Sequence, residues 1–400
     1  MSAIFYFFMV LSYYITTIFT VKLTSYMSQK ELKVLIIGGG LAGLTSAIHL
    51  IKDGFEVTLI EKNPYPKHKV CGEYISNEVL SYLEKLGVYP FDHQAKKIDK
   101  FQFSSVSGAT LDITLPLGGF GMSRYALDAL MVNQAIKLGV YVQQATVTDV
   151  QFKEDQFQVT TNTHQKYTAD YVLGAFGKRS SMDITLSRKF IKKKSAWLGV
   201  KAHYKSDFPD DLVALHNFNG GYCGLSKVET DHVNACYLAD YASFKKYKNI
   251  EEYQQEVLYK NKALKHFFEN SEMVFEAPVT ISQISFDKKE PIVDHIFMIG
   301  DSAGLIHPLC GNGMAMAIHS AKIISSLLVQ QKSYTLTRSQ LEQHYTKAWN
   351  DAFQKRLNIG RWIQNALQHK RLTRMGVSIV STSPYLLKTI IKSTHGTALV

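Results

Sequence analysis

Cysteine is scarce in this sequence of 400 residues, and that scarcity excludes several kinds of site. No two cysteines have C-x-x-C spacing, so we expect neither a structural zinc site nor a thioredoxin-type motif. So few cysteines in so long a chain do not indicate a disulfide framework, and a reducing cytoplasmic location fits best. Without an H-E-x-x-H motif, we expect no metal site. The cysteines are Cys71, Cys223, Cys236 and Cys310.

Acidic residues are scarce at the C-terminal end. Residues 332–400 carry eleven Lys or Arg but only Asp351 and Glu342 as acids, against a net charge of +11 for the whole chain. This basic tail has two interpretations, a solvated helical face or a face that binds an anionic membrane surface. No nucleic-acid-binding motif accompanies the charge, so we expect no nucleic-acid partner. The sequence does not indicate the oligomeric state.

Charged residues are absent from residues 2–21, a segment long enough to span a bilayer. No Lys or Arg precedes this apolar run, which argues against a cleaved signal peptide. Two alternatives remain open. The segment anchors the protein, with Lys22, Lys30 and Lys33 keeping the next domain in the cytoplasm, or it is translated upstream sequence and Met27 is the true start. We expect a cytoplasmic protein, with membrane association through residues 2–21 or the basic tail as the alternative.

The first strong pattern is a strand, a helix and a second strand. Residues 33–38 (KVLIIG) form an unbroken apolar, β-branched run, which predicts a buried strand. Residues 41–52 have a helical pattern, and residues 56–60 (EVTLI) predict the second strand. This order is typical of a dinucleotide-binding unit.

Glycines fill the turn between the first strand and the helix in a G-x-G-x-x-G pattern. Such glycines allow a tight turn, the approach of a pyrophosphate and close packing of helix on strand. The helix N-terminus then presents free N–H groups to the phosphates. Glu61 follows at the end of the second strand, where a carboxylate accepts hydrogen bonds from a ribose. The expected nucleotide-binding residues are Gly38, Gly40, Leu41, Ala42, Gly43, Glu61 and Lys62. This unit alone does not separate FAD from NAD.

The resemblance of residues 296–317 (IFMIGDSAGLIHPLCGNGMAMA) to a known flavin motif favours FAD over NAD. These residues resemble the second flavin motif of the flavoprotein family of p-hydroxybenzoate hydroxylase and geranylgeranyl reductase, and the likeness covers most of residues 33–330. The resemblance implies that Asp301 binds the ribityl chain of FAD. It also implies that a turn before the next helix faces the flavin pyrimidine edge and stabilises negative charge on the reduced ring. That turn is Gly311, Asn312, Gly313 and Met314.

Two more segments are similar to this family. Arg124, in SRYALDALMVNQAIKLGV, matches an Arg at the start of a helix near FAD, although a surface Arg at a helix start is the alternative. Val147 stands on the next strand, where the family's backbone touches adenine. Residues 170–181 (DYVLGAFGKRSS) resemble the family's Asp-Gly segment, but Phe176 replaces its Asp. In hydroxylases that segment is linked to FAD and nicotinamide binding, so Phe176 weakens the hydroxylase interpretation.

Residues 69–73 (KVCGE) resemble the K-x-C-G stretch of geranylgeranyl reductases, in which the Cys is implicated in catalysis. The resemblance makes Cys71 the candidate catalytic residue, a thiol that donates the proton completing alkene reduction. The alternative is a small packing residue. Geranylgeranyl reductases have an aromatic Y-x-W-x-F-P motif, of which this chain keeps only Tyr222. Its other residues are absent, which weakens the case for a geranylgeranyl substrate. His307 and Cys310 stand in the flavin-side loop, where structural roles are the simpler interpretation.

Strand–helix alternation at the start and consecutive strands between residues 197 and 239 predict two interleaved domains. We expect a discontinuous, Rossmann-like α/β FAD-binding domain, a smaller sheet-rich substrate domain and a C-terminal helical tail. A helix over 124–138 and then one strand through Val150 belong to this prediction. The segments are 1–30 (apolar), 31–67, 121–180 and 292–330 (FAD-binding), 68–120 and 181–291 (substrate), and 331–400 (basic tail).

The residues and the resemblance together predict an FAD-dependent oxidoreductase with NAD(P)H as electron donor. The first interpretation is reduction of a carbon–carbon double bond in an apolar, isoprenoid-like or polyketide-like small molecule. The second is an FAD-dependent monooxygenase that hydroxylates an aromatic or lipid-like substrate. The third is a non-catalytic, membrane-associated flavoprotein.

Overall fold

The computed structural model describes most of the chain beyond residue 30. The described residues are 31–106, 109–193, 195–282, 284–306, 311–333, 336–368, 383, 385–387, 389, 391 and 396–399. Residues 2–21, Met27, His307 and Cys310 lie outside them, so the expectations attached to those residues stay predictions. Within the described ranges, no helix is long and apolar enough to cross a membrane.

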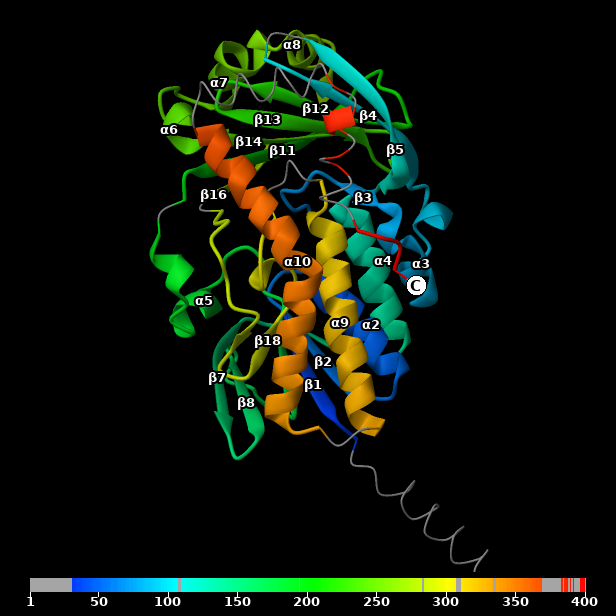
Figure 1. The fold of residues 1–400 in the computed structure, drawn as a ribbon, viewed down its shortest axis with the longest axis vertical. Helices are drawn as coiled ribbons and strands as arrows, with labels where there is room; N and C mark the ends of the chain where they lie inside the picture. Colours follow the sequence, from blue (N-terminus) through cyan, green and yellow to red (C-terminus); the bar gives the residue numbers. More distant parts are fainter. Residues whose placement is uncertain are drawn as a thin grey trace, which may run out of the picture.

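A six-stranded sheet forms the lower half of the molecule in Figure 1. Its strands are parallel except for one antiparallel edge pair. The central strand is buried from Val34 to Ile37, because a parallel sheet is covered on both faces. The strand order is β17 (Ile292–Val293), β18 (Ile296–Met298), β10 (Tyr171–Gly174), β1 (Lys33–Ile37), β2 (Glu56–Glu61) and β6 (Tyr141–Gln144).

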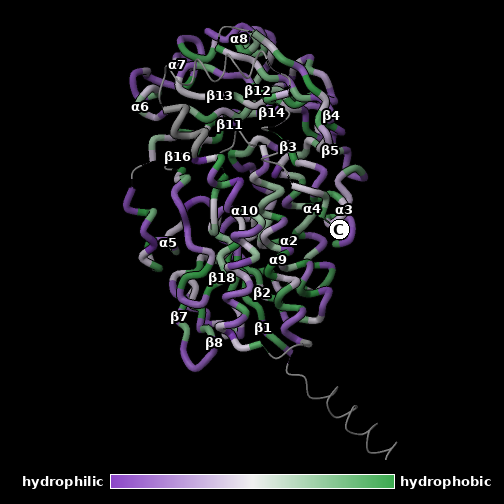
Figure 2. The backbone as a smooth tube through the Cα atoms, viewed as in Figure 1, coloured by the Kyte–Doolittle hydropathy of each residue, from purple (hydrophilic) through white to green (hydrophobic). Residues whose placement is uncertain are grey.

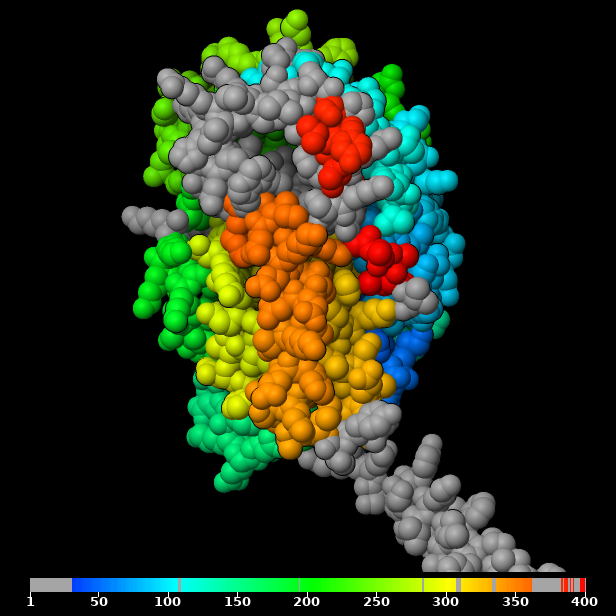
Figure 3. Space-filling view, viewed as in Figure 1, coloured from blue at the N-terminus to red at the C-terminus, as the bar shows by residue number. Residues whose placement is uncertain are grey.

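Four long helices pack beside this sheet and contact one another in series. Figure 3 shows the last of them lying along the surface beside its predecessor. Hydrophobic residues concentrate where the sheet and these helices meet (Figure 2). Ser123 caps the helix that begins at Arg124, since its Oγ accepts a hydrogen bond from the Ala126 N–H at 3.0 Å. The helices are α2 (Leu41–Lys52), α4 (Arg124–Lys137), α9 (Gly313–Ser333) and α10 (Arg338–Gln368).

The prediction of a single strand through Val150 is wrong, because this segment forms two strands that belong to two different sheets. The first part, β6, ends at Gln144, and the second part begins a three-stranded meander. Asn162 explains the break: its Oδ1 accepts from the Thr146 N–H, and its own N–H donates to the Thr146 carbonyl, both at 2.8 Å. The meander is β7 (Val147–Lys153), β8 (Gln156–Thr161) and β9 (Lys166–Ala169).

A larger sheet forms the upper half of the molecule, with short helices on its outer side (Figure 1). The strand order is β15 (Glu272–Met273), β11 (Trp197–Lys205), β14 (Val233–Asp240), β13 (Gly221–Lys227), β12 (Leu212–Phe218), β4 (Lys96–Ser104), β5 (Thr110–Gly121) and β3 (Tyr74–Ser76), while β16 (Val279–Ser282) also pairs with β11. The helices on this sheet are α6 (Tyr241–Phe244), α7 (Ile250–Glu256) and α8 (Lys262–Glu269), and the shorter α3 (Leu80–Lys85) and α5 (Ser181–Thr185) lie lower down.

The two faces of the larger sheet differ, because successive side chains of a strand point to opposite faces. From β11, Val200 and Ala202 join an apolar cluster beneath α7 and α8. Trp197 points to the opposite face of the sheet and belongs to a different apolar cluster. Lys201 and His203, at alternate positions of the same strand, point to the same face as Trp197. This second face looks toward α4 and α9 and is called the inner face below. The architecture confirms the predicted α/β fold, with a Rossmann-like unit, a sheet-rich unit and a C-terminal helix.

The stability of this fold should depend on pH through His216 of β12. His216 is 3% exposed, and its Nδ1 lies 2.8 Å from the Ser104 Oγ. Burial lowers the pKa of His216 to about 4. Between that pH and the unfolded value near 6.5, only the unfolded chain binds a proton here. The free energy of unfolding should therefore fall as the pH drops through this window, by about 2 kcal/mol at pH 5.

Urea unfolding at pH 7 and pH 5 tests this expectation. His216→Asn keeps a group that can bond to Ser104 but cannot titrate, so the loss of stability between the two pH values should shrink by about 2 kcal/mol. An unchanged loss in the variant would show that other groups cause the pH dependence.

Candidate functional site

The glycine turn after β1 leaves no room for side chains. Gly38 has a φ of +106°, and a Cβ placed on it would lie 2.4 Å from the Ala175 carbonyl oxygen. A Cβ on Gly43 would lie 2.0 Å from the Gly38 oxygen. Because both positions demand glycine, α2 packs directly against β1 and its first turn faces the end of the sheet.

The N-terminus of α2 is free to bind an anion. Gly40 precedes the helix, no side chain caps it, and its first turn carries no acidic residue. The first N–H groups of a helix, here including those of Leu41 and Ala42, have no partner within the helix. A Cβ on Gly40 would lie 3.7 Å from the Arg124 Nη2, so a cation also borders the turn. These features suit a phosphate group.

Glu61 lies at the same turn, as the sequence predicts. Its Oε2 accepts from the Gly39 N–H at 2.7 Å, and its Oε1 accepts from the Asn63 N–H at 2.9 Å. The neighbouring stretch before Val147 is close, since the Ala145 N–H donates to the Glu61 carbonyl at 3.1 Å. Lys62 instead has an exposed side chain. The glycine turn, Glu61 and the start of β7 therefore meet at one end of the six-stranded sheet.

Arg124 is not a surface residue, since its side chain is 12% exposed. Its Nε and Nη2 each donate to a different oxygen of Asp128 at 2.8 Å, and Lys69 donates to the same carboxylate at 2.7 Å. Burial alone would lower the pKa of Arg124, but the charge and hydrogen bonds of Asp128, together with Glu73 and Cys71, outweigh it and raise the pKa above its usual value. The guanidinium is thus a fixed cation beside the glycine turn.

Two buried cations hold the turn that carries Asp301. Lys289 donates to the Asp301 carbonyl at 2.7 Å, and Arg188 donates to the Ser302 carbonyl at 2.8 Å. Burial lowers the pKa of Lys289 to about 8. Lys289 also donates to the Lys178 carbonyl at 3.1 Å, so it joins the Asp301 turn to the segment that follows Phe176.

The predicted flavin turn meets the Cys71 loop, which we define as residues 70–73. Gly311 has a φ of +64°, Asn312 is buried and donates to Glu78 at 3.2 Å, and α9 begins at Gly313. The Cys71 Sγ lies 3.3 Å from the Met314 Sδ. The structure therefore brings the candidate thiol to the turn expected at the flavin ring.

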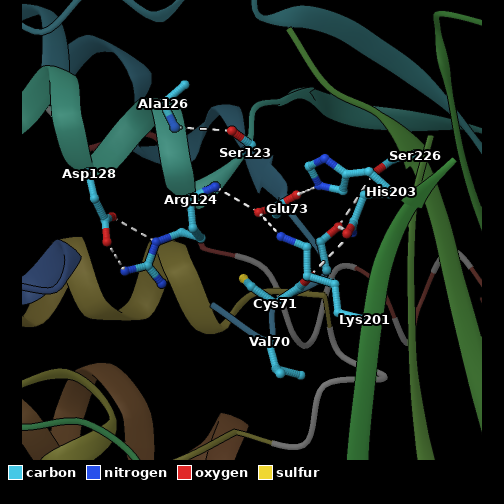
Figure 4. Close-up of polar contacts among 12 residues, drawn as sticks. Val70, Cys71, Glu73, Ser123, Arg124, Ala126, Asp128, Lys201, His203 and Ser226 are labelled. Atoms are coloured by element: carbon cyan, nitrogen blue, oxygen red, sulfur yellow. Dashed lines mark hydrogen bonds and ion pairs between the residues drawn. The ribbon is translucent and has the colours of Figure 1, made fainter. Parts of the chain in front are cut away.

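Sequence reasoning missed a buried charged cluster beside this loop. Glu73 is fully buried with a φ of +55°, and its carboxylate accepts from Lys201 at 2.5 Å, His203 at 2.7 Å and the Arg124 N–H at 2.7 Å (Figure 4). Burial alone would raise the pKa of Glu73, but Lys201 and His203 outweigh it and lower the pKa. Lys201 and His203, two polar residues at alternate positions in the buried part of β11, were the signal that could have found the cluster.

The cluster also has the residue types of a metal site. His68, Glu73 and His203 offer ligand atoms within 4.8 Å of one another. The Lys201 ammonium already balances the Glu73 charge, which opposes a divalent cation at this place. The expectation that the protein has no metal site stays a prediction.

Known proteins with similar sequences include both reductases and a monooxygenase. Conditioned medium factor receptor 1 of Dictyostelium discoideum is 23% identical over 352 residues, which cover 80% of this chain and 68% of the relative. FAD-dependent monooxygenase atnA of an Arthrinium species is 25% identical, over 74% of this chain but only 45% of the relative's length. Digeranylgeranylglycerophospholipid reductase 1 of Methanothermobacter thermautotrophicus is 25% identical, over 71% of this chain and 73% of the relative.

Solved structures share the fold. A flavin-dependent brominase, Bmp2, superposes with a TM-score of 0.75 at 17% identity, covering 90% of this chain and 92% of its own. A geranylgeranyl bacteriochlorophyll reductase-like protein from Thermoplasma acidophilum gives 0.72 at 18% identity, with 90% and 96% covered. The family model described as FAD binding domain matches residues 31–345, well over half of the chain. The protein therefore belongs to the FAD binding domain family of flavin-dependent oxidoreductases.

Proposed function

We propose that the protein uses FAD, reduced by NAD(P)H, to reduce a carbon–carbon double bond in an apolar substrate. The observation that carries this proposal is the place of Cys71. Its thiol contacts Met314 of the turn where the flavin ring is expected, and the Cys71 carbonyl accepts a hydrogen bond from Asn234 of the inner face. A reductase needs a hydride source on one side of an alkene and a proton donor within reach.

The residues at the proposed cofactor site fit FAD. The free N–H groups at the start of α2 suit its pyrophosphate, Glu61 suits a ribose and Asp301 suits the ribityl chain. Gly38 and Gly43 keep the turn free of side chains where the nucleotide must approach. When bound, FAD supplies hydride chemistry, while the protein positions the substrate and limits the access of water.

The substrate side of the site is apolar away from the Cys71 loop. On the inner face, Trp197, Leu215, Tyr222 and Leu238 belong to one buried apolar cluster. Such a wall stabilises a hydrocarbon by removing its surface from water, at about 25 cal/mol per Å². Tyr222, the one residue kept from the reductases' aromatic motif, belongs to this wall. The proposed substrate therefore places its double bond near Cys71 and its apolar body along the sheet.

A monooxygenase is the second candidate, because the chain is similar to the monooxygenase atnA. Phe176, in place of the Asp of hydroxylases, is the residue that counts against it. Anaerobic reduction of the bound flavin followed by addition of a polyprenyl alkene separates the two. Reoxidation with formation of a saturated product supports the reductase, whereas turnover only after oxygen is admitted supports the monooxygenase. A flavin that no donor reduces would support a non-catalytic flavoprotein.

The cofactor assignments predict weaker FAD binding in two variants. Glu61→Ala and Asp301→Ala each remove charge-assisted hydrogen bonds to a sugar or ribityl hydroxyl, worth about 1.5–3 kcal/mol. The dissociation constant of FAD should rise about 10- to 100-fold in each variant, as measured by titration of apoprotein. Glu56→Ala, at the exposed start of β2, is the matched control and should bind normally. Normal affinity in both test variants would refute the assigned positions.

The proposed role of Cys71 predicts a selective loss in Cys71→Ser. A hydroxyl keeps the size of the thiol but is a far weaker acid, so FAD binding and reduction by the donor should stay nearly normal. Reoxidation by the alkene should fall at least ~10-fold in stopped-flow measurements. Cys223→Ala, on the outer face of the sheet, is the control. Wild-type reoxidation in both Cys71→Ser and Cys71→Ala would make Cys71 a packing residue.

A further inference from the structure

Four polar side chains form a patch on the otherwise apolar inner face of the large sheet. Lys201 and His203 come from β11, Asn234 from β14 and Ser226 from β13. They lie in adjacent cross-strand rows, because His203 pairs with Asn234, Asn234 pairs with Ser226, and Lys201 pairs with Cys236. All four residues are buried, so their polar groups need partners.

The Cys71 loop supplies those partners. Asn234 donates to the Cys71 carbonyl at 3.2 Å and to the Gly72 carbonyl at 2.9 Å, and Ser226 lies 3.4 Å from the Gly72 carbonyl. Lys201 and His203 bind the Glu73 carboxylate (Figure 4). The loop therefore lies across these rows, held at Cys71 and Gly72 by Asn234 and at Glu73 by Lys201 and His203.

The charged part of the patch extends toward solvent. The His203 ring contacts His68 edge-on, with ring centroids 5.2 Å apart. His68 is partly exposed and stacks on Tyr125 with centroids 4.6 Å apart. Titratable groups thus run from the partly exposed His68, through His203 and Glu73, to Lys201, whose side chain is fully buried.

We propose that Lys201, Glu73 and His203 form the proton-exchange unit of the Cys71 thiol. This inference rests on the proposed function. When the thiol gives its proton to a substrate carbon, the Lys201 ammonium returns a proton to the sulfur, and Lys201 regains one from solvent through His68, His203 and Glu73. One proton enters and one leaves in the product, so the unit returns to its starting charge. The Cys71 Sγ contacts Met314, so exchange requires a side-chain rotation or one bridging water.

Among the residues that the structure describes, the other charged groups near Cys71 have hydrogen-bond partners of their own. From α4, Arg124 donates two hydrogen bonds to Asp128, which Lys69 also binds. After β10, Lys178 donates to the Val70 carbonyl at 3.1 Å. Cys236 of β14 also faces the loop, and burial raises its pKa to about 12. Among these cations, Lys201 is the one coupled to a chain of titratable groups that extends toward solvent.

Alkylation of Cys71 by iodoacetamide tests the unit without any substrate. The protein is loaded with oxidised FAD at pH 8, and mass spectrometry follows the modified peptide. On the proposed arrangement, Lys201→Met removes the cation that exchanges a proton with the sulfur and should slow alkylation about tenfold, whereas Glu73→Gln removes an anion and should accelerate it by a similar factor. Lys205→Met, at the exposed end of the same strand, is the control and should react normally.

Opposite changes in the two variants distinguish this unit from a structural role, since mere loosening of the loop would accelerate alkylation in both. The double variant, with both charges removed, should react at nearly the wild-type rate. Where Lys201→Met does not retain FAD, Lys201→Gln replaces it, because its amide can still donate to Glu73. Equal rates, or acceleration in both single variants, would overturn the proposal. So would purified protein that holds one metal per chain and loses it in His203→Gln.

The alkylation experiment and the turnover experiment test different claims, so either claim can be rejected while the other stands. Opposite alkylation changes together with normal turnover of Cys71→Ser would keep the charge coupling but reject the proposed reductase role of the thiol. If Cys71→Ser loses turnover but the alkylation rates do not change in opposite directions, the thiol remains the proton donor and another group reprotonates it.

Discussion

The buried carboxylate of Glu73 is the interaction on which the site depends. A buried ion is stable only when it is paired and hydrogen-bonded, and the donors to Glu73 come from two different layers of the molecule. The N–H of Arg124 belongs to α4, whereas Lys201 and His203 belong to the large sheet. Glu73 therefore fixes the sheet relative to the start of α4. It also fixes Cys71, two residues earlier in the same loop.

Buried charges also hold the turn that carries Asp301, where two cations donate to backbone oxygens. Lys289 and Arg188 bind the carbonyls of Asp301 and Ser302, which leaves the Asp301 side chain free of that task. Carbonyls so bound cannot rearrange without leaving a buried charge unpaired, a costly state. The turn expected at the ribityl chain is thus preorganised by residues that do not themselves need to touch FAD.

Local signals in the sequence predicted the nucleotide-binding unit well. The helix Leu41–Lys52 has the predicted bounds, because the glycine turn and the apolar periodicity define both of its ends within a short stretch. The break after Gln144 was not predictable from that stretch. It depends on the hydrogen bonds of Thr146 with Asn162, a residue on a different strand connection.

The charged cluster shows the limit of sequence reasoning more clearly. Glu73 lies 128 residues from Lys201 and 130 from His203, and no local pattern encodes such a pairing. Lys and His in a buried strand imply that partners exist, since buried charges are paired. The identity of those partners required the fold. The contact of Cys71 with Met314, 243 residues apart, is of the same kind.

A crystal structure of the protein with FAD bound tests the proposed arrangement most directly. The isoalloxazine ring should lie against the place where the Cys71 loop meets the Gly311–Met314 turn, facing the inner face of the large sheet, with the pyrophosphate at the start of α2. A ring on the far side of the Gly311–Met314 turn, away from Cys71 and Lys201, would contradict both the reductase proposal and the role of the Glu73 cluster.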